Sequence, residues 1–275
     1  MVKKVKRNAK QLQKSIKSKR HVKNDVASTN RASVPTFPPN LVPLKHCDHS
    51  GCYTPPSKIV ILHPSSVFLV RNFLEKSDCE RWVNQVEENI GFEVVSHSAT
   101  RDYAHRQCGR IQCEDWVIAD RLYEKMRPIL KEITSQISIK HTNPTYRHMG
   151  CNGNVRIYKY EKGMSFGRHY DGSNIIPCYP NGCTEITVLI YLSSCEGGAT
   201  RFYPPQSTGM GSKRQTKKSA GLEQKSGIAF VPEIGSILLH VHGDKCLLHE
   251  ADPVLRGSKY VLRTDIVYGT GNRIN

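Results

Sequence analysis

The sequence predicts a mainly β, α+β fold, in which N-terminal helices support a jelly roll (a double-stranded β-helix). Two observations carry this prediction. Between residues 154 and 268 the apolar residues alternate with polar ones in short segments, which turns rich in Gly, Pro, Asn and Ser separate. Before them, two longer segments repeat apolar residues at helical spacing. Eight strands over about 115 residues suit two packed sheets with room for a small molecule between them.

Charge divides the chain into two parts. Of its 275 residues, 40 are Lys or Arg and 24 are Asp or Glu. Residues 1–24 hold ten of the basic residues and no acidic one, and residues 28–39 are rich in Ser, Asn, Thr and Pro. Such a composition cannot bury a core, so we expect residues 1–55 to form a basic, disordered tail. Residues 56–275 are long enough for one globular domain.

The sequence shows no secretory signal, no ER-retention signal and no apolar run of membrane-spanning length. We therefore expect an intracellular protein, nuclear and/or cytoplasmic, that has no membrane partner. Its ten cysteines are expected to be free thiols. The basic patch at residues 3–7 predicts a nuclear-import signal or a weak nucleic-acid contact through the tail.

The elements before residue 150 are expected to support the sheets. Lys58–Leu62 and Val67–Asn72 are typical of short strands. A Ser-x-x-Glu capping box at Ser77 predicts the start of the first helix, and Gly91 predicts its end. The second helix is expected from about Asp115 to Ile133.

The later elements are expected to be strands, joined by turns. They are Asn154–Glu161, Phe166–Asp171, Glu185–Ser193, Ala199–Tyr203, Gly227–Val231, Ser236–Val241, Cys246–Glu250 and Lys259–Tyr268. The stretch Gln206–Lys225 is rich in Lys, Gly and Ser, which predicts an exposed loop. Gly91–Ile111 is expected to be a loop as well.

Polar and hydroxylated side chains recur on one face of several of these strands. These faces carry Glu185, Thr187, Leu189 and Tyr191; Arg156, Tyr158 and Tyr160; and Lys259, Val261, Arg263 and Asp265. Such faces can line a buried site for a dicarboxylate. They can equally meet water, as antiparallel sheets often do.

One group of residues has the types and spacing of a metal site. His169 and Asp171 are two positions apart in an extended segment, so their side chains share a strand face. His249, from a distant strand, completes a set of two imidazoles and one carboxylate. That set suits ferrous iron and leaves three coordination positions open. Lys259, ten residues beyond His249, can hold the far carboxylate of an organic acid bound to the metal.

With these motifs in order, roughly residues 67–269 resemble the prolyl 4-hydroxylase-type 2-oxoglutarate/Fe(II)-dependent dioxygenase family. The resemblance lies in Tyr158–Gly163, Phe166–Asp171, Leu189–Ser193, the Gly-Gly hairpin Glu196–Phe202, Val231–Leu239, Leu248–Val254 and Gly257–Tyr260. It implies that residues 56–275 are a dioxygenase domain. The tail is outside the resemblance.

The resemblance also implies site roles and cofactors. The implied iron ligands are His169, Asp171 and His249, with Lys259 on the C5 carboxylate of 2-oxoglutarate and Tyr191 and Tyr160 hydrogen-bonding that cosubstrate. The implied cofactors are Fe(II), the cosubstrate 2-oxoglutarate, O2 and L-ascorbate.

Two assignments have competitors on neighbouring positions. Arg263 lies on the same strand face as the lysine, and its planar guanidinium suits a carboxylate, although it can instead pair with Asp265. The spacing from His249 matches the family and favours the lysine. His240 and His242 rank below His249, because no cation follows either of them ten residues later.

The implied function is hydroxylation of an unactivated C–H bond, on a prolyl (or other) residue of an intracellular protein, with release of succinate and CO2. One alternative is oxidation of a nucleic-acid base or a small molecule by the same chemistry. The tail and the basic run at residues 213–218 motivate it, although no aromatic residues are interleaved with the basic clusters to stack bases. Another is a non-catalytic nucleic-acid- or protein-binding module. Substrate specificity is expected from the loops Gly91–Ile111 and Gln206–Lys225.

Zinc-type ligands also cluster at His46, Cys47, His49 and Cys52. Structural zinc sites usually bring two ligand pairs together across a longer separation. The sequence offers no second pair nearby, so we expect a polar loop here and not a metal site.

Overall fold

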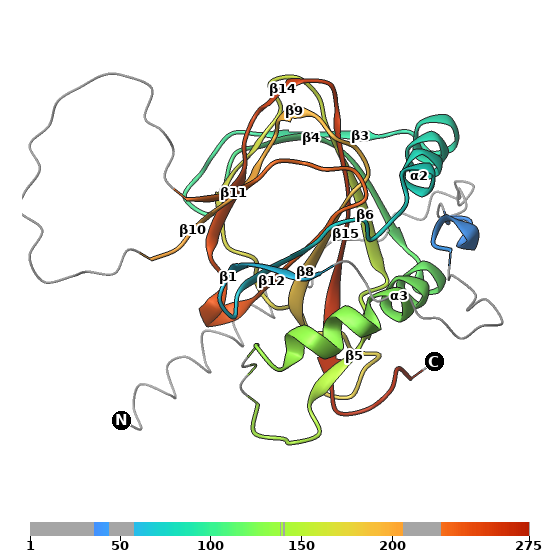
Figure 1. The fold of residues 1–275 in the computed structure, drawn as a ribbon, viewed down its shortest axis with the longest axis vertical. Helices are drawn as coiled ribbons and strands as arrows, with labels where there is room; N and C mark the ends of the chain where they lie inside the picture. The colour runs from blue at the N-terminus through green and yellow to red at the C-terminus, as the bar shows by residue number, and fades with distance from the viewer. Residues whose placement is uncertain (1–35, 44–57, 138, 140, 206–226, 275) are drawn as a thin grey trace, which may run out of the picture. The chain divides into compact units, whose positions relative to one another are not determined.

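The structure is a computed structural model that describes residues 36–43, 58–137, 139, 141–205 and 227–274. Contacts divide the chain into Met1–Ser33 and Val34–Asn275, and every described residue belongs to the second unit. Figure 1 shows this unit as a curved antiparallel sheet with two long helices outside it. No described helix combines the length and the apolar character that a membrane span requires. The expected mainly β jelly roll with supporting helices is confirmed.

The described elements follow one another from η1 to β15. They are η1 (Pro39–Leu41), β1 (Val60–His63), β2 (Val67–Val70), α2 (Lys76–Asn89), β3 (Glu93–His97), β4 (Arg106–Glu114), α3 (Trp116–Thr134), β5 (Arg147–Cys151), β6 (Asn154–Tyr160), β7 (Phe166–His169), β8 (Cys183–Tyr191), β9 (Glu196–Gly197), β10 (Thr200–Tyr203), β11 (Ile228–Phe230), β12 (Ile237–Val241), η2 (Gly243–Lys245), β13 (Leu248–Ala251), β14 (Val254–Arg256) and β15 (Lys259–Gly269). All eight strands expected after residue 150 are present, with ends shifted by a few residues at most.

The strands form one large sheet and one small sheet. The large sheet has the order β1-β2-β12-β8-β15-β6-β4-β7-β13-β10-β11, with β3 paired to β4 and β5 paired to β15. The small sheet pairs β14 with β9. Every ladder between named strands is antiparallel, and most neighbours are distant in sequence. This crossed order brings the motifs of β7, β13 and β15 to the inside of the curved sheet.

The two helices cover the outer face of the sheet. The carboxylate of Asp115 accepts a hydrogen bond of 2.9 Å from the backbone of Ile118, so it caps α3 at the expected place. The capping box expected at Ser77 is wrong, because α2 begins at Lys76 and Ser77 already lies within its first turn. A helical backbone angle at that residue prevents it from acting as the N-cap.

Strand β8 shows how alternation separates the core from the site. Its residues Ile186, Val188 and Ile190 are buried in the large apolar cluster that also contains the helices. Leu189 and Tyr191 point to the opposite face, where they join the apolar cluster inside the curve of the sheet. The expectation that this strand has one packing face and one site face therefore holds, since alternate residues face opposite sides.

The expectation for Gly91–Ile111 needs correction. This stretch is not a loop throughout, since it contains β3 and the first part of β4, which pair in register from Glu93 opposite Arg110 to His97 opposite Arg106. Charged and polar residues dominate both strands, so their apolar alternation is weak. Pairing with its neighbours in the sheet stabilises β4 as a strand, although its own sequence pattern does not predict one.

Residues 36–43 fall in the range expected to be a disordered tail, yet they pack on the domain. Phe37, Leu41 and Val42 are buried in the large apolar cluster, and the Phe37 ring meets Trp82 edge-on with 5.0 Å between centroids. A short apolar segment can be held by a partner surface even when its flanks are polar. The rest of the expected tail, residues 1–35 and 44–55, lies outside the described residues. So do the cluster at residues 46–52 and the stretch Gln206–Lys225 that was expected to form a loop.

Candidate active site

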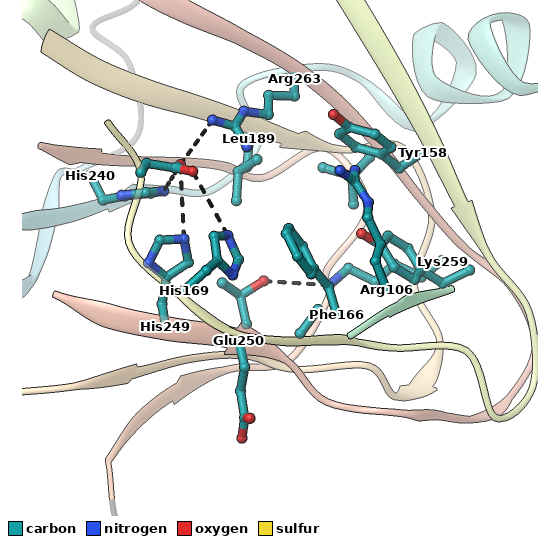
Figure 2. A pocket seen from close by; sticks show the side chains of 15 residues that line it. Arg106, Tyr158, Phe166, His169, Leu189, His240, His249, Glu250, Lys259 and Arg263 are labelled. Atoms are coloured by element: carbon teal, nitrogen blue, oxygen red, sulfur yellow. Dashed lines mark hydrogen bonds and ion pairs between the residues drawn. The ribbon is translucent and has the colours of Figure 1, made fainter. Parts of the chain in front are cut away.

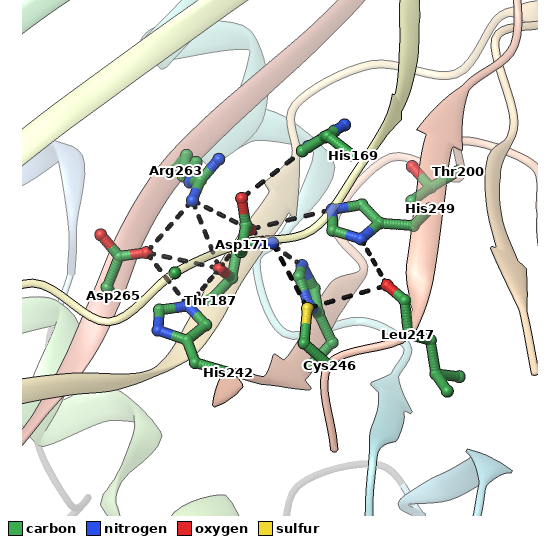
Figure 3. A network of polar contacts seen from close by, with 12 residues as sticks. His169, Asp171, Thr187, Thr200, His242, Cys246, Leu247, His249, Arg263 and Asp265 are labelled. Carbon is green, nitrogen blue, oxygen red and sulfur yellow. Dashed lines mark hydrogen bonds and ion pairs between the residues drawn. The ribbon is translucent and has the colours of Figure 1, made fainter. Parts of the chain in front are cut away.

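The register of two strands brings the distant histidines together. His169 on β7 lies directly opposite His249 on β13 in the antiparallel ladder, and their ring centroids are 4.2 Å apart. Asp171 follows two residues after His169, where β7 has ended. The three side chains expected to bind a metal therefore converge (Figure 3), although they come from two segments about 80 residues apart.

The donor atoms of this group lie within 4.8 Å of one another, close enough to share one metal ion. The Nε2 atoms of His169 and His249 each lie 3.8 Å from an oxygen of the Asp171 carboxylate. The Nδ1 atom of His169 is 2.8 Å from the Gly167 carbonyl oxygen, and that of His249 is 2.8 Å from the Leu247 carbonyl oxygen. Each Nδ1–H donates to its carbonyl, which leaves the Nε2 lone pairs facing Asp171.

The charge states also fit a metal site. Burial lowers the pKa of His169 to about 4, so its imidazole is neutral at pH 7. Burial lowers the pKa of His249 as well. Burial alone would raise the pKa of Asp171, but the positive charge of Arg263 holds it well below its ordinary range. Two neutral imidazoles and one carboxylate suit Fe(II), since they leave coordination positions open.

Two neighbours fix the Asp171 carboxylate. Its Oδ2 atom accepts a hydrogen bond of 2.7 Å from the Thr187 hydroxyl and lies 2.9 Å from Nη2 of Arg263. Arg263 also lies 3.5 Å from Asp265 (Figure 3). Asp265 in turn pairs with Arg156. The ion pair that the sequence offered as the other role of Arg263 is thus present, and the guanidinium is committed to two carboxylates.

Lys259 is in a different situation. It is 2% exposed, and its Nζ atom donates to the Gly198 carbonyl at 2.7 Å and lies 3.4 Å from the Thr200 hydroxyl. No ion pair between Lys259 and a carboxylate is found among the described residues, and burial lowers its pKa to about 8. A buried ammonium of this kind is well placed to receive the carboxylate of a ligand.

The two tyrosines expected at the site have different environments. Tyr160 lies opposite Lys259 in the β6–β15 ladder and lines the cavity. Tyr191 is fully buried and donates a hydrogen bond of 2.8 Å to the Thr200 hydroxyl. Thr200, and not Tyr191, is among the residues that line the cavity.

A cavity joins the histidine end to the lysine end, as Figure 2 shows. Its lining residues are Arg106, Tyr158, Tyr160, Phe166, His169, Asp171, Leu189, Thr200, His240, His249, Glu250, Ala251, Lys259, Val261 and Arg263. Leu189, Val261 and Phe166 give it an apolar wall. The carboxylate of Glu250 points away from the histidines (Figure 2) and accepts a hydrogen bond from the Tyr203 hydroxyl.

Sequence reasoning missed Arg106, the first residue of β4. Its guanidinium carbon lies 4.4 Å from the Tyr158 ring centroid and 4.5 Å from that of Phe166, so it is held between two aromatic rings. Because Gly91–Ile111 was expected to be a loop, no strand face was assigned to this residue. Phe166 belongs to the motif Phe166–Asp171 and pairs with Arg106 in the sheet. Its presence in that motif does not indicate that Arg106 is its partner.

A family comparison agrees with the fold and the donor set. Residues 155–264 match the family model of the 2OG-Fe(II) oxygenase superfamily. This segment contains His169, Asp171, His249, Lys259 and Arg263, and over it the protein is similar to that superfamily. The dioxygenase class expected from the motifs is thereby confirmed. The family implies Fe(II), 2-oxoglutarate and O2, and the residues of the cavity fit these groups.

Solved structures similar to this chain come from a virus, an animal and a bacterium. A viral collagen prolyl hydroxylase from Paramecium Bursaria Chlorella virus-1 is 18% identical, with a TM-score of 0.47 over 76% of this chain and 99% of that chain. A prolyl hydroxylase in complex with a hypoxia inducible factor peptide, from Trichoplax adhaerens, is 16% identical, with a TM-score of 0.47 over 74% and 83% of the two chains. A Pseudomonas putida prolyl-4-hydroxylase is 15% identical, with a TM-score of 0.41 over 77% and 94%. A search of curated proteins finds no match.

Proposed function

We propose that the protein hydroxylates an unactivated C–H bond on a prolyl (or other) residue of an intracellular protein, with release of succinate and CO2. The observation that supports this most is the convergence of two Nε2 atoms and one carboxylate at one end of a cavity that has a buried ammonium at the other. A 2-oxo acid with a second carboxylate has the two functional groups that such a cavity can hold. The prolyl substrate and L-ascorbate as reductant rest on the motif resemblance.

In this proposal His169, Asp171 and His249 hold the iron. When bound, the iron activates O2 for attack on a C–H bond. Thr187 and Arg263 hold the Asp171 carboxylate at its Oδ2 atom, so that Oδ1 stays turned toward His169. Such outer contacts orient a metal ligand and commonly decide metal affinity.

Lys259 takes the C5 carboxylate of 2-oxoglutarate. Tyr160 contacts the same cosubstrate, and Tyr191 acts through Thr200, whose hydroxyl it holds toward the cavity. Leu189 and Val261 keep water out, which strengthens the attraction between the ammonium and the carboxylate. A non-catalytic binding module would need neither a buried ammonium at one end of the cavity nor a convergent donor set at the other.

The test is cosubstrate turnover by an Asp171→Ala variant. We expect the full-length protein to bind one Fe(II) per chain and to convert 2-oxoglutarate to succinate, and Asp171→Ala to lose both properties. Asp244→Ala, which removes an exposed carboxylate from η2, is the matched control and should keep both. Retention of iron and succinate formation in Asp171→Ala would show that the ligand assignment is wrong.

The substrate requires a separate measurement. Cells that carry the active protein and cells that carry Asp171→Asn should be compared for protein residues that gain one oxygen atom. We expect prolyl residues to be enriched among those that depend on the active protein. If only nucleic-acid bases or small molecules are oxidised, and no protein residue is, the proposed protein substrate is wrong.

A further inference from the structure

A second set of metal-type donors lies beside the iron triad and shares one residue with it. His240 on β12, Cys246 just before β13, and His249 are all buried. Each offers a donor atom, and these atoms lie within 4.8 Å of one another. The rings of His240 and His249 meet edge-on, with centroids 4.6 Å apart. Figure 2 shows both rings directed toward the same end of the cavity.

His240 is a buried histidine whose ring nitrogens are not satisfied by the described part of the protein. The residue is 2% exposed, and neither of its ring nitrogens has a hydrogen-bond partner among the described residues. Its Nε2 atom lies 3.5 Å from Oδ2 of Asp171. A buried polar side chain without partners is costly and rare, so it points to a ligand that would satisfy it.

Cys246 gives this set a sulfur donor that the iron triad lacks. Its Sγ atom accepts a hydrogen bond of 3.3 Å from the backbone N–H of Asp171, so the sulfur lies next to this ligand of the iron triad (Figure 3). A thiolate with two imidazoles is a donor set for zinc and other soft divalent ions. Divalent zinc also outranks ferrous iron in affinity for most nitrogen and sulfur sites.

We propose that His240, Cys246 and His249 bind a soft divalent ion, with Zn²⁺ the best fit, in a second metal mode beside the iron triad. The thiol proton of Cys246 is released to solvent when the ion binds. The fourth position falls to Asp171 or to water, since Oδ2 of Asp171 is 3.5 Å from His240 and 3.8 Å from His249. Binding of the soft metal excludes iron, because the two sites share His249. This consequence rests on the proposed function.

The test uses Co(II) as a spectroscopic probe in full-length protein that carries Cys47→Ser and Cys52→Ser. These two changes remove the thiols of the cluster at residues 46–52. We expect a near-ultraviolet sulfur-to-cobalt charge-transfer band that saturates at one Co(II) per chain and disappears when Zn²⁺ is added. The band should be lost in Cys246→Ser. It should be kept in Cys183→Ser, which removes a half-buried thiol of β8 that does not belong to the proposed metal site.

Two further arms separate this site from the iron site. Asp171→Ala should keep the cobalt–sulfur band while losing anaerobic binding of Fe(II) with 2-oxoglutarate. Cys246→Ser should lose the cobalt–sulfur band and keep anaerobic binding of Fe(II) with 2-oxoglutarate. In the parent protein, adding Fe(II) and 2-oxoglutarate without oxygen should lower the band, because His249 is shared.

The results distinguish failure of the soft-metal site from failure of the proposed hydroxylase function. A parent protein without the band, or a band that survives in Cys246→Ser, would overturn the second metal mode and leave the iron site untouched. A band that behaves as expected in a parent protein that binds no Fe(II) with 2-oxoglutarate would instead remove the proposed hydroxylase function, while the soft-metal site would stand.

Discussion

Two cations, Lys259 and Arg263, lie four residues apart on one face of β15, and their surroundings give them different tasks. The guanidinium of Arg263 is neutralised by Asp171 at 2.9 Å and by Asp265 at 3.5 Å. The ammonium of Lys259 has a carbonyl and a hydroxyl as neighbours and no ion pair with an acidic group of the described residues. A ligand carboxylate therefore gains most from Lys259.

We expect Lys259→Ala to raise the concentration of 2-oxoglutarate required for half-maximal turnover. Loss of a charge-assisted pair in a largely dry cavity costs about 1.5–3 kcal/mol, which corresponds to roughly ten- to a hundred-fold in binding. Arg263→Ala, measured at saturating iron, should change this requirement less and should weaken iron retention instead. The reverse ranking would assign the carboxylate to Arg263.

The protonation of Lys259 makes cosubstrate binding depend on pH. Burial lowers its pKa from 10.5 to about 8, so the free protein holds a charged ammonium below that pH and loses it above. Affinity for 2-oxoglutarate should therefore fall as the pH rises through about 8, by up to about tenfold per pH unit. Anaerobic titrations at several pH values measure this. Lys259→Arg stays charged and should show a flat profile there; an equally steep profile in that variant would place the titration elsewhere.

At the level of elements, a single turn connects the helical layer to the site strand β8. The N–H of Gly235 donates to the Tyr191 carbonyl at 2.8 Å, and its own carbonyl accepts from the N–H of Leu74 at 3.0 Å. Gly235 has a φ of +81°, and a Cβ there would lie 2.3 Å from the Leu74 carbonyl oxygen. Only glycine satisfies both constraints.

We expect Gly235→Ala to destabilise the protein more than Gly163→Ala. Gly163 has a similar φ of +83°, but a Cβ there meets no atom within 4 Å. Its substitution should cost only the left-handed backbone penalty of about 1–2 kcal/mol, whereas Gly235→Ala adds a collision with backbone. Urea unfolding of both variants compares the two costs. Equal losses would mean that the Leu74 backbone moves aside without cost.

The sequence predicted the elements well where alternation was strong and poorly where it was weak. In β8 and β15 the apolar and polar faces were clear, so the cavity face could be named in advance, including Leu189, Lys259 and Arg263. In β4 the charged residues weaken the alternation, so neither the strand nor the position of Arg106 in the cavity was predicted. The contact between Arg263 and Asp171 depends on how β15 lies against the segment after β7, and no local pattern contains that information.

At the scale of the whole molecule, the boundary of the folded unit lies earlier than composition suggests. The backbone N–H of Phe37 donates to the Asp115 carboxylate at 3.0 Å, and the carbonyl of Val42 accepts from Nε of Arg121 at 2.9 Å. Residues 36–43 thus tie α3 to the rest of the apolar cluster. Composition averages over a window, and this short apolar segment between polar stretches is diluted by its flanks.

Two truncations should therefore behave differently. A protein that begins at Val34 should fold, turn over 2-oxoglutarate at a near-normal rate, and lose nuclear enrichment or salt-sensitive nucleic-acid binding with the ten basic residues of positions 1–24. A protein that begins at Ser57 also loses Phe37, Leu41 and Val42, whose burial stabilises by about 1.5–3 kcal/mol each at most. Its urea midpoint should be clearly lower. Equal midpoints for the two truncations would show that residues 36–43 contribute nothing to stability, and would return the boundary to the position that composition indicates.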